Sequence, residues 1–313
     1  DMALTDLRSI LQRVTSDPAM LRYLDLATST GASPNENYSR ELMELFTMGA
    51  GNFGEEDVRA AAKALAGWVE PRPTGTADVV VDPKNNVTRK YPVYDQPATG
   101  TFAPQREYKG APFKYLGKTA QWNTDQLIDQ ILAQDATAPL VVSRVLEHFV
   151  MAQPPRDYIN RLAAGFRKST YDVKTLMRDV FKSPEFSSQA AYRALVKSPT
   201  ELMVGALRAL GAASQAKIAV AAGANMGQVL FDPPDVGGWP NNDSWISSNT
   251  VVARVNFVTG LLNAVKTLPA ANDAHQHHLD GILSPQTASL LNSATDDRTR
   301  WLLVLASPEF QLK

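Results

Sequence analysis

Apolar residues recur at helical spacing along most of the chain. Leu4, Leu7 and Leu11 lie three or four residues apart, as on one face of a helix, and Asp17-Pro18 then starts a second short helix. The same spacing returns in the second half of the chain. It predicts helices over residues 3–27, 35–49, 55–65, 124–134, 137–152, 156–168, 172–182, 187–196, 199–211, 215–230, 245–266, 285–293 and 296–306.

After residue 70 the helical spacing disappears, and Pro, Gly and Thr become frequent. The apolar run 79–81 and the pair Val87-Thr88 flank the turn-forming residues 82–86, which predicts a small hairpin. We therefore predict a mainly α protein, a multi-helix orthogonal bundle in a single domain of residues 1–313. A small irregular β insertion is expected near residues 72–118.

Four Ser-Pro pairs punctuate the second half of the chain. They begin at Ser183, Ser198, Ser284 and Ser307. A serine side chain can accept a hydrogen bond from the first free N–H groups of a helix, and proline fits the first helical turn because it needs no donor there. Each pair is therefore expected to start a helix.

Composition and charge exclude several classes of function. The chain has 31 Lys and Arg against 32 Asp and Glu, a formal net charge of -1, so no overall basic field exists to hold nucleic acid. No stretch is apolar for long enough to span a membrane. The chain contains no cysteine, which excludes disulfides, thiolate catalysis and cysteine-based metal sites.

Histidine gives little support for a metal site. The chain has four His and no Glu-x-x-His motif of the di-iron type. His275, His277 and His278 lie in a polar stretch that is expected to be an exposed connection. His148 lies in an apolar helix and is expected in the core or at its boundary. No metal or cofactor is predicted, and the common nucleophile and phosphate-binding motifs are absent.

Residues 35–49, called the signature helix below, combine an apolar face with dense charge. Glu36, Arg40 and Glu44 are spaced four residues apart, and Glu41 is three residues from Glu44. The functional interpretation is a carboxylate–guanidinium cluster that binds a polar substrate or a cation, with one carboxylate as general base. The alternatives are a solvated stripe of ion pairs and a buried network that locks helices together.

Residues 231–246, called the Trp239 loop below, contain three prolines and two glycines and cannot form a regular helix or a central strand. A rigid loop that carries Trp239 and Trp245 suits a binding platform for a sugar or another flat partner. The alternative is a plug in which both indoles fill the core. Asp235 is one of three aspartates in the loop, and Arg254 could pair with one of them.

The signature helix and the Trp239 loop are predicted to form one pocket. Arg40 would grip an anionic or hydroxyl group of the ligand. Trp68, Trp239 and Trp245 would form aromatic walls.

Several segments together resemble one bacterial family, which is catalogued as domain of unknown function 1800. The resemblance covers nearly the whole chain. The matching segments are Tyr23-Leu24-Asp25, residues 35–49, Gly67-Trp68, Leu116-Gly117, Ser183-Pro184-Glu185-Phe186, Lys197-Ser198-Pro199, and residues 231–245 with Arg254.

The resemblance implies a largely helical protein that is exported from the cytoplasm, and a gene often found beside one for a sulfatase-like protein. It implies no general activity. Family members also carry an upstream aromatic motif with histidines, so the chain is expected to be N-terminally incomplete. Where members often have His-Asp before Leu-Gly, this chain reads Arg106-Glu107-Tyr108-Lys109. A metal-dependent activity is therefore disfavoured.

Three classes of function remain. The favoured one is an exported binding or assembly protein that acts at the cell envelope or on an extracellular polymer. The alternatives are a hydrolase of glycans or esters that uses paired carboxylates, and a structural subunit of a larger assembly. The expected partner is a polymer or a small polar ligand, with a protein of the sulfatase-like family as a further candidate.

Overall fold

The computed structural model describes residues 2–82 and 87–313, and its contacts divide the chain into two compact units. Unit 1 comprises residues 1–145 and 155–182, and unit 2 comprises residues 146–154 and 183–313. Each unit is described by itself, and the single domain stays a prediction. The mainly α fold with a small β insertion is confirmed. Within the described residues no helix has the length and apolar character of a membrane span.

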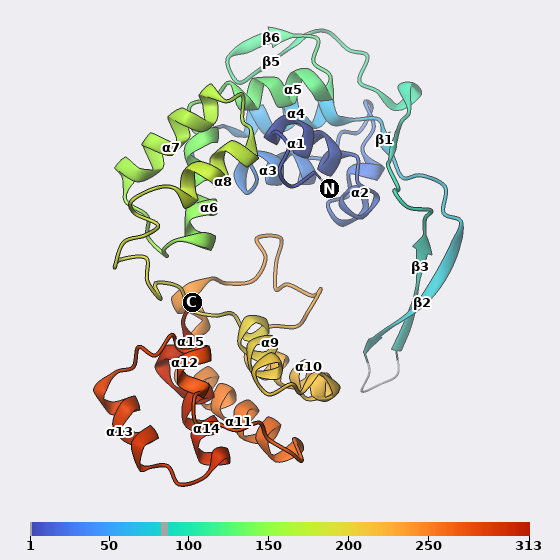
Figure 1. Ribbon diagram of the computed structural model, residues 1–313. Helices are drawn as coiled ribbons and strands as arrows, with labels where there is room; N and C mark the ends of the chain where they lie inside the picture. Colours follow the sequence, from blue (N-terminus) through green and yellow to red (C-terminus); the bar gives the residue numbers. More distant parts are fainter. Residues whose placement is uncertain (1, 83–86) are drawn as a thin grey trace. The chain divides into compact units, whose positions relative to one another are not determined.

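The first eight helices belong to unit 1, apart from the last residues of α6, which belong to unit 2 (Figure 1). Two short 3-10 helices, η1 (Leu26–Thr28) and η2 (Pro104–Arg106), lie between them in sequence. The α-helices are α1 (Leu7–Thr15), α2 (Pro18–Tyr23), α3 (Asn37–Glu44), α4 (Glu55–Leu65), α5 (Thr124–Leu132), α6 (Thr137–Phe149), α7 (Arg156–Lys168) and α8 (Val173–Phe181).

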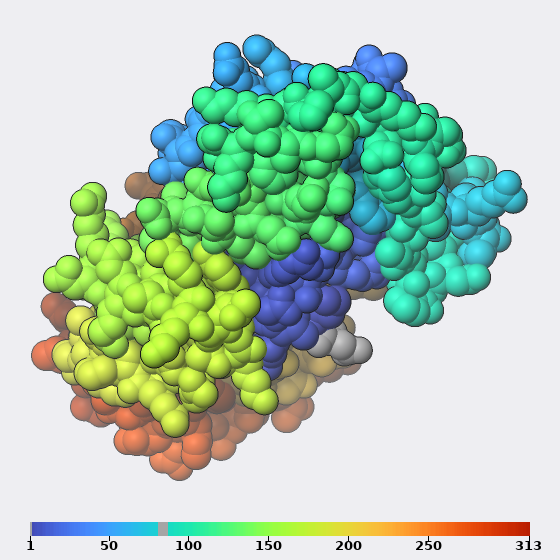
Figure 2. All heavy atoms as spheres, turned by 90° about the horizontal axis from the view of Figure 1, so that it is seen from above, coloured from blue at the N-terminus to red at the C-terminus, as the bar shows by residue number. Residues whose placement is uncertain are grey.

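The core of unit 1 forms where the apolar faces of these helices meet. Helix α1 packs on α5, and Figure 2 shows the dark blue atoms of the first helices directly beside the green atoms of the α5 region. At the edge of this contact Arg8 pairs with Asp129 at 2.5 Å. The side chains that are fully buried here include Leu21, Tyr38, Leu42, Met43, Leu65, Tyr115, Leu127 and Ile128.

The β insertion consists of two-stranded antiparallel pairs. Strand β1 (Trp68–Val69) pairs with β4 (Thr101–Phe102), and β2 (Gly75–Asp82) pairs with β3 (Val87–Val93). The second pair is the predicted hairpin, whose turn at residues 83–86 lies outside the described residues. Strand β5 (Phe113–Tyr115) pairs with β6 (Lys118–Ala120).

The Leu116-Gly117 pair forms the two-residue turn between β5 and β6. Both residues have positive φ, 41° and 85°, as a tight hairpin of matching twist requires. Leucine is unusual in this conformation, and side chains around it hold its backbone. The Leu116 N–H donates to Asp57 at 2.8 Å, and its carbonyl accepts from the Gln130 amide at 3.0 Å. The turn is thereby tied to α4 and α5.

Unit 2 is built from the remaining helices around one apolar core. That core includes Leu202, Met203, Phe257, Leu261 and Trp301. Two 3-10 helices, η3 (Ala213–Gln215) and η4 (Asn242–Trp245), connect the elements. The α-helices are α9 (Pro199–Ala209), α10 (Ala216–Asn225), α11 (Ser248–Ala264), α12 (Ala274–His278), α13 (Pro285–Ser293), α14 (Asp297–Ala306) and α15 (Pro308–Gln311).

Three of the four Ser-Pro pairs start helices as predicted. Ser198, Ser284 and Ser307 each accept a hydrogen bond from a backbone N–H in the first turn of α9, α13 and α15. Ser183 is followed by turns rather than a helix, so this prediction is wrong.

Residues 187–196 also form turns, and the helix predicted there is wrong. Two features of the segment are incompatible with a helix. Arg193 has a φ of 51°, and the Leu195 N–H and carbonyl both pair with Lys313, at 3.2 and 2.8 Å. The apolar spacing of this segment therefore reflects long-range pairing rather than a helical face.

The signature helix is shorter than predicted, because α3 ends at Glu44. After Glu44 the backbone hydrogen bonds span more residues than the four of an α-helix. The N–H groups of Met48 and Gly49 both donate to the Met43 carbonyl, at 2.8 and 3.0 Å. Gly49 has a φ of 83°, which suits glycine and closes the turn.

Tyr38 offers a test of the unit 1 core. Thr15 gives its proton to the Leu11 carbonyl at 2.8 Å, so the buried Tyr38 hydroxyl donates to Thr15 at 2.7 Å. Tyr38→Phe removes this bond and should lower the free energy of unfolding by about 1 kcal/mol in urea titrations. Tyr23→Phe, at a 53% exposed position, is the control and should change little. Equal changes in the free energy of unfolding for Tyr38→Phe and Tyr23→Phe would contradict the hydrogen bond assigned to the Tyr38 hydroxyl.

Candidate functional site

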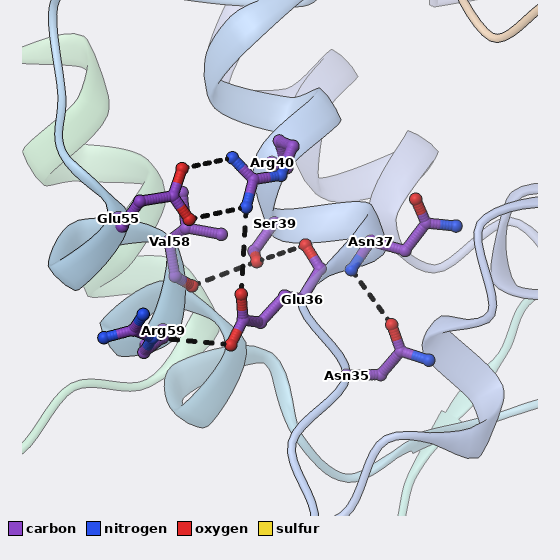
Figure 3. A network of polar contacts seen from close by, with 8 residues as sticks. All are labelled: Asn35, Glu36, Asn37, Ser39, Arg40, Glu55, Val58 and Arg59. Atoms are coloured by element: carbon purple, nitrogen blue, oxygen red, sulfur yellow. Dashed lines mark hydrogen bonds and ion pairs between the residues drawn. The ribbon is translucent and has the colours of Figure 1, made fainter.

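Glu36 and Arg40 of the signature helix form an alternating chain of ion pairs with α4 (Figure 3). Arg40 makes a bidentate pair with Glu55, both contacts at 2.7 Å, and lies 3.8 Å from Glu36. Glu36 in turn lies 3.8 Å from Arg59. The side chains are between 35% and 62% exposed, so water screens the pairs strongly.

This geometry occupies the guanidinium of Arg40. Its two NH groups face the two carboxylate oxygens of Glu55, and this hydrogen bonding raises the pKa of Arg40. Beneath the pair, the Ser39 hydroxyl lies 2.8 Å from the Glu36 carbonyl and 3.1 Å from the Val58 carbonyl. The cluster therefore fastens α3 to α4. A catalytic or ligand-binding role for it stays a prediction.

Glu41 of the signature helix has a carboxyl group whose pKa is changed by burial. Burial raises the pKa of Glu41, the nearby charge of Glu44 raises it further, and Arg40 lowers it. Both carboxylates lie on α3 and are half-buried. Folding therefore disfavours the ionised form of Glu41, as expected for a carboxylate near a like charge.

Trp68 is half-buried in unit 1. Its indole N–H donates to the Thr124 hydroxyl at 3.0 Å, and its ring meets the edge of Phe102 at a centroid distance of 5.7 Å. A side-chain carbon on Gly67 would lie 2.8 Å from Phe102, so the glycine before Trp68 permits this packing. The arrangement gives Trp68 a packing role between β4 and α5.

The Trp239 loop places its two indoles differently. Trp245 is 4% exposed and is part of the protein interior. Trp239 is half-buried and lines a hollow at the surface of unit 2. Asp235 is exposed and accepts a hydrogen bond from the Gly237 N–H at 2.8 Å, which closes a turn of the loop. Of these predicted residues, Trp239 and Trp245 lie together in the hollow.

Arg254, on α11, is 2% exposed and lies among neutral partners. Its guanidinium donates to the Lys197 carbonyl at 2.8 Å and to the Gln311 side chain at 3.1 Å. The expected ion pair with an aspartate of the Trp239 loop does not occur among the described residues. Burial without a counter-charge lowers the pKa of Arg254.

These bonds of Arg254 hold two distant segments together. Residues 195–197 precede α9, and residues 311–313 comprise the last residue of α15 and the two residues after it. The Lys197 N–H donates to the Gln311 carbonyl at 2.8 Å, and Val196 bridges to Leu312 as in an antiparallel sheet. Arg254 therefore clamps this pair of segments through its two hydrogen bonds.

Unit 2 contains a cavity of about 920 Å³, and its lining includes Lys197 and Lys313 from the two joined segments. Its walls carry charged, imidazole and aromatic side chains, including His148, Tyr192, Arg193, Lys197, Glu201 and Lys313. His148 is exposed here, which corrects its expected core or boundary position.

A second hollow of about 380 Å³ adjoins the cavity, because both are lined by His148, Glu201 and Lys313. Trp239 and Trp245 line this second hollow together with hydroxyls and amides, among them Ser198, Thr200, Gln228, Asn241 and Asn242. The two spaces are called the unit 2 cleft below. A partly apolar concavity with a few polar groups is the usual form of a ligand site.

Two cavity carboxylates remain ionised. Burial acts to raise the pKa of Glu201, but hydrogen bonds from Lys313 and Ser198 outweigh it and lower the pKa. Burial likewise opposes the hydrogen bonds from Ser284 and Thr287 that lower the pKa of Glu309. Neither group is thereby suited to act as a general acid near neutral pH.

Lys197 and the other charged residues of the cavity were not predicted as site residues. A signal for Lys197 was present, since Lys197-Ser198-Pro199 is one of the matching segments. The cavity itself depends on the pairing with residues 311–313, which local spacing does not reveal. No group of three or more His, Asp or Glu that could hold a metal ion occurs in the described residues.

The predicted pocket joins residues of both units. Glu36, Arg40, Glu41, Glu44 and Trp68 belong to unit 1, whereas Asp235, Trp239, Trp245 and Arg254 belong to unit 2. A pocket that contains both sets stays a prediction.

Comparison with known proteins identifies the family. The model of the family described as protein of unknown function (DUF1800) matches residues 1–312, so the chain belongs to this family. No curated protein and no solved structure matches the chain.

The raised pKa of Glu41 predicts a pH-dependent effect on stability. A raised carboxyl pKa contributes stability below the unfolded value of 4.5, and this contribution is lost as pH rises through the folded pKa. Glu41→Gln mimics the protonated form, so it should raise the urea midpoint at pH 7 and leave it nearly unchanged at pH 3.5. Glu107→Gln, at an exposed loop position, is the control. An equal change in the urea midpoint of Glu41→Gln at pH 7 and at pH 3.5 would contradict a raised pKa of Glu41 as the cause.

The clamp predicts a large cost for Arg254→Ala. The substitution leaves a cavity and removes two hydrogen bonds, so unit 2 should lose about 2–4 kcal/mol in urea unfolding. Arg208→Ala, at an exposed position on α9, should change stability by less than about 0.5 kcal/mol. A loss at Arg254 as small as that at Arg208 would show that the clamp is unimportant.

Proposed function

We propose that this member of the DUF1800 family is a binding protein for an extracellular polymer, with the unit 2 cleft as its binding site. The observation that carries the proposal is that two hollows, of about 920 and 380 Å³, adjoin at His148, Glu201 and Lys313. Adjoining spaces of this kind suit an extended chain better than a single small molecule.

The chemistry of the cleft favours a glycan as the polymer. The ring of Trp239 offers a flat apolar surface, and the neighbouring Asn241 and Asn242 amides and the Thr200 hydroxyl can exchange hydrogen bonds with sugar hydroxyls. Charges of both signs line the larger cavity. A polar, largely uncharged chain meets these groups without a large electrostatic penalty.

Binding rather than hydrolysis is proposed because of the state of the carboxylates. A glycosidase needs one carboxylic acid with a raised pKa to protonate the leaving group. In the cleft, the pKa values of Glu201 and Glu309 are lowered, and both groups are hydrogen-bonded to protein partners. The proposal further places the protein outside the cytoplasm, at the cell envelope; the export implied by the family resemblance supports this.

The test is binding to a panel of soluble polysaccharides, measured by affinity electrophoresis and isothermal titration calorimetry. Trp239→Ala should weaken binding about tenfold or more, because a desolvated Trp commonly dominates such a contact. Phe231→Ala is the matched control: Phe231 lies in the same loop, is 97% exposed and lines neither hollow.

Two results would count against the proposal. One is the absence of binding to every polysaccharide in the panel. The other is equal binding by the Trp239→Ala and Phe231→Ala variants, which would place the ligand elsewhere. Circular dichroism of each variant serves as the control that its fold is intact.

A further inference from the structure

Lys197 lines the large cavity of unit 2 with an ammonium group held by neutral partners. Its Nζ donates to the Phe310 carbonyl at 2.7 Å and lies 4.1 Å from the centroid of the Phe310 ring. No ion pair of Lys197 occurs among the residues that the structure describes. A half-buried lysine without a carboxylate partner is unusual, because burial disfavours its charge.

The carboxylates near Lys197 are already engaged. Glu201 accepts hydrogen bonds from Lys313 and from the Ser198 N–H, and Asp280 lies 3.9 Å from Arg193. Glu201 and Asp280 still favour the ammonium form, whereas Arg193 and Lys313 oppose it. Burial is the largest influence and lowers the pKa of Lys197 to about 8.

The backbone of Lys197 is fixed on both sides. Its N–H donates to the Gln311 carbonyl, and its own carbonyl accepts from the buried Arg254. The next residue, Ser198, caps α9 through the Glu201 N–H. The side chain therefore starts from a rigid point, which is a feature of preorganised reactive groups.

We propose that Lys197 is a nucleophilic amine that captures the aldehyde or ketone group of a polar organic ligand in this cavity as an imine. The inference rests on the proposed function in one respect, namely that the cavity admits a polar organic ligand. An open-chain reducing end of a saccharide belongs to this ligand class.

The step balances without any further reagent. The unprotonated amine keeps one N–H on the Phe310 carbonyl and attacks the carbonyl carbon with its lone pair. A C–N bond forms, and a proton passes from nitrogen to oxygen to give a carbinolamine. The hydroxyl then leaves with the remaining proton of the nitrogen as one molecule of water, which produces the C=N bond. No oxidant or reductant takes part.

The experiment uses glyceraldehyde as the probe and sodium cyanoborohydride to trap the imine on the full chain. At pH 7 about a tenth of an amine with a pKa near 8 is unprotonated, against well under a thousandth for an ordinary lysine. Peptide mapping should therefore show Lys197 modified at least about tenfold faster than Lys217, an exposed lysine of the same unit. Its rate should level off above about pH 8, whereas that of Lys217 should keep rising.

Variants define the site further. Lys197→Arg keeps the positive charge and should abolish the trapping at this position, while Lys217→Arg should leave it unchanged. If Lys197→Arg does not fold, the peptide map of the unsubstituted chain still decides whether Lys197 is modified faster than Lys217. Modification of Lys197 no faster than Lys217 overturns the proposal.

The outcomes separate this inference from the proposed function. A chain that binds a polysaccharide but shows no preference for Lys197 overturns the imine chemistry alone. A chain that is trapped preferentially at Lys197 but binds no polysaccharide supports the imine chemistry and overturns the polymer as ligand.

Discussion

The hydrogen bonds of one buried guanidinium hold two distant segments of unit 2 together. Arg254 is 2% exposed and joins the Lys197 carbonyl to the Gln311 side chain, so it fastens residues 195–197 to residues 311–313. Two of its nitrogens are bonded to neutral oxygens, a backbone carbonyl and a side-chain amide, which take the place of a carboxylate, whereas its buried Nε has no hydrogen-bond partner among the described residues. The segments it joins supply Lys197 and Lys313 to the cavity wall.

The parts of the fold that were predictable depend on local chemistry. The spacing of apolar residues located most helices, and Ser198, Ser284 and Ser307 start helices because a cap and a first-turn proline act within one turn. The predictions that are wrong fail because they concern segments whose structure depends on contacts with distant residues. Residues 187–196 were predicted as a helix, but Leu195 pairs with Lys313, more than a hundred residues away, and no local pattern encodes that contact. The lowered pKa of Lys197 has the same origin, since Phe310 and Lys313 belong to the distant segment.

The signature helix illustrates why charge density alone is a weak indicator of a site. Its sequence spacing placed Glu36 and Arg40 on one stripe correctly, but α4 supplies the partners that satisfy them, Glu55 and Arg59. Alternation of sign across two helices gives specificity of packing more than stability, because exposed pairs contribute little each. Glu41 lies apart from this chain of pairs and carries a raised pKa, so the signature helix contains both satisfied and disfavoured charge.

The two kinds of recognition proposed for the unit 2 cleft differ in what they require of the protein. Contact with the ring of Trp239 needs shape and an apolar face, and it tolerates small displacements of the ligand. The proposed capture by Lys197 needs an unprotonated amine at a fixed position; burial lowers the pKa of Lys197, and hydrogen bonds hold its backbone in place. Glu201 favours the ammonium form of Lys197, whereas the positive charge of Lys313, which pairs with Glu201, opposes it. Glu201 and Lys313 line both the larger cavity and the hollow that contains Trp239, so this pair belongs to both proposed sites.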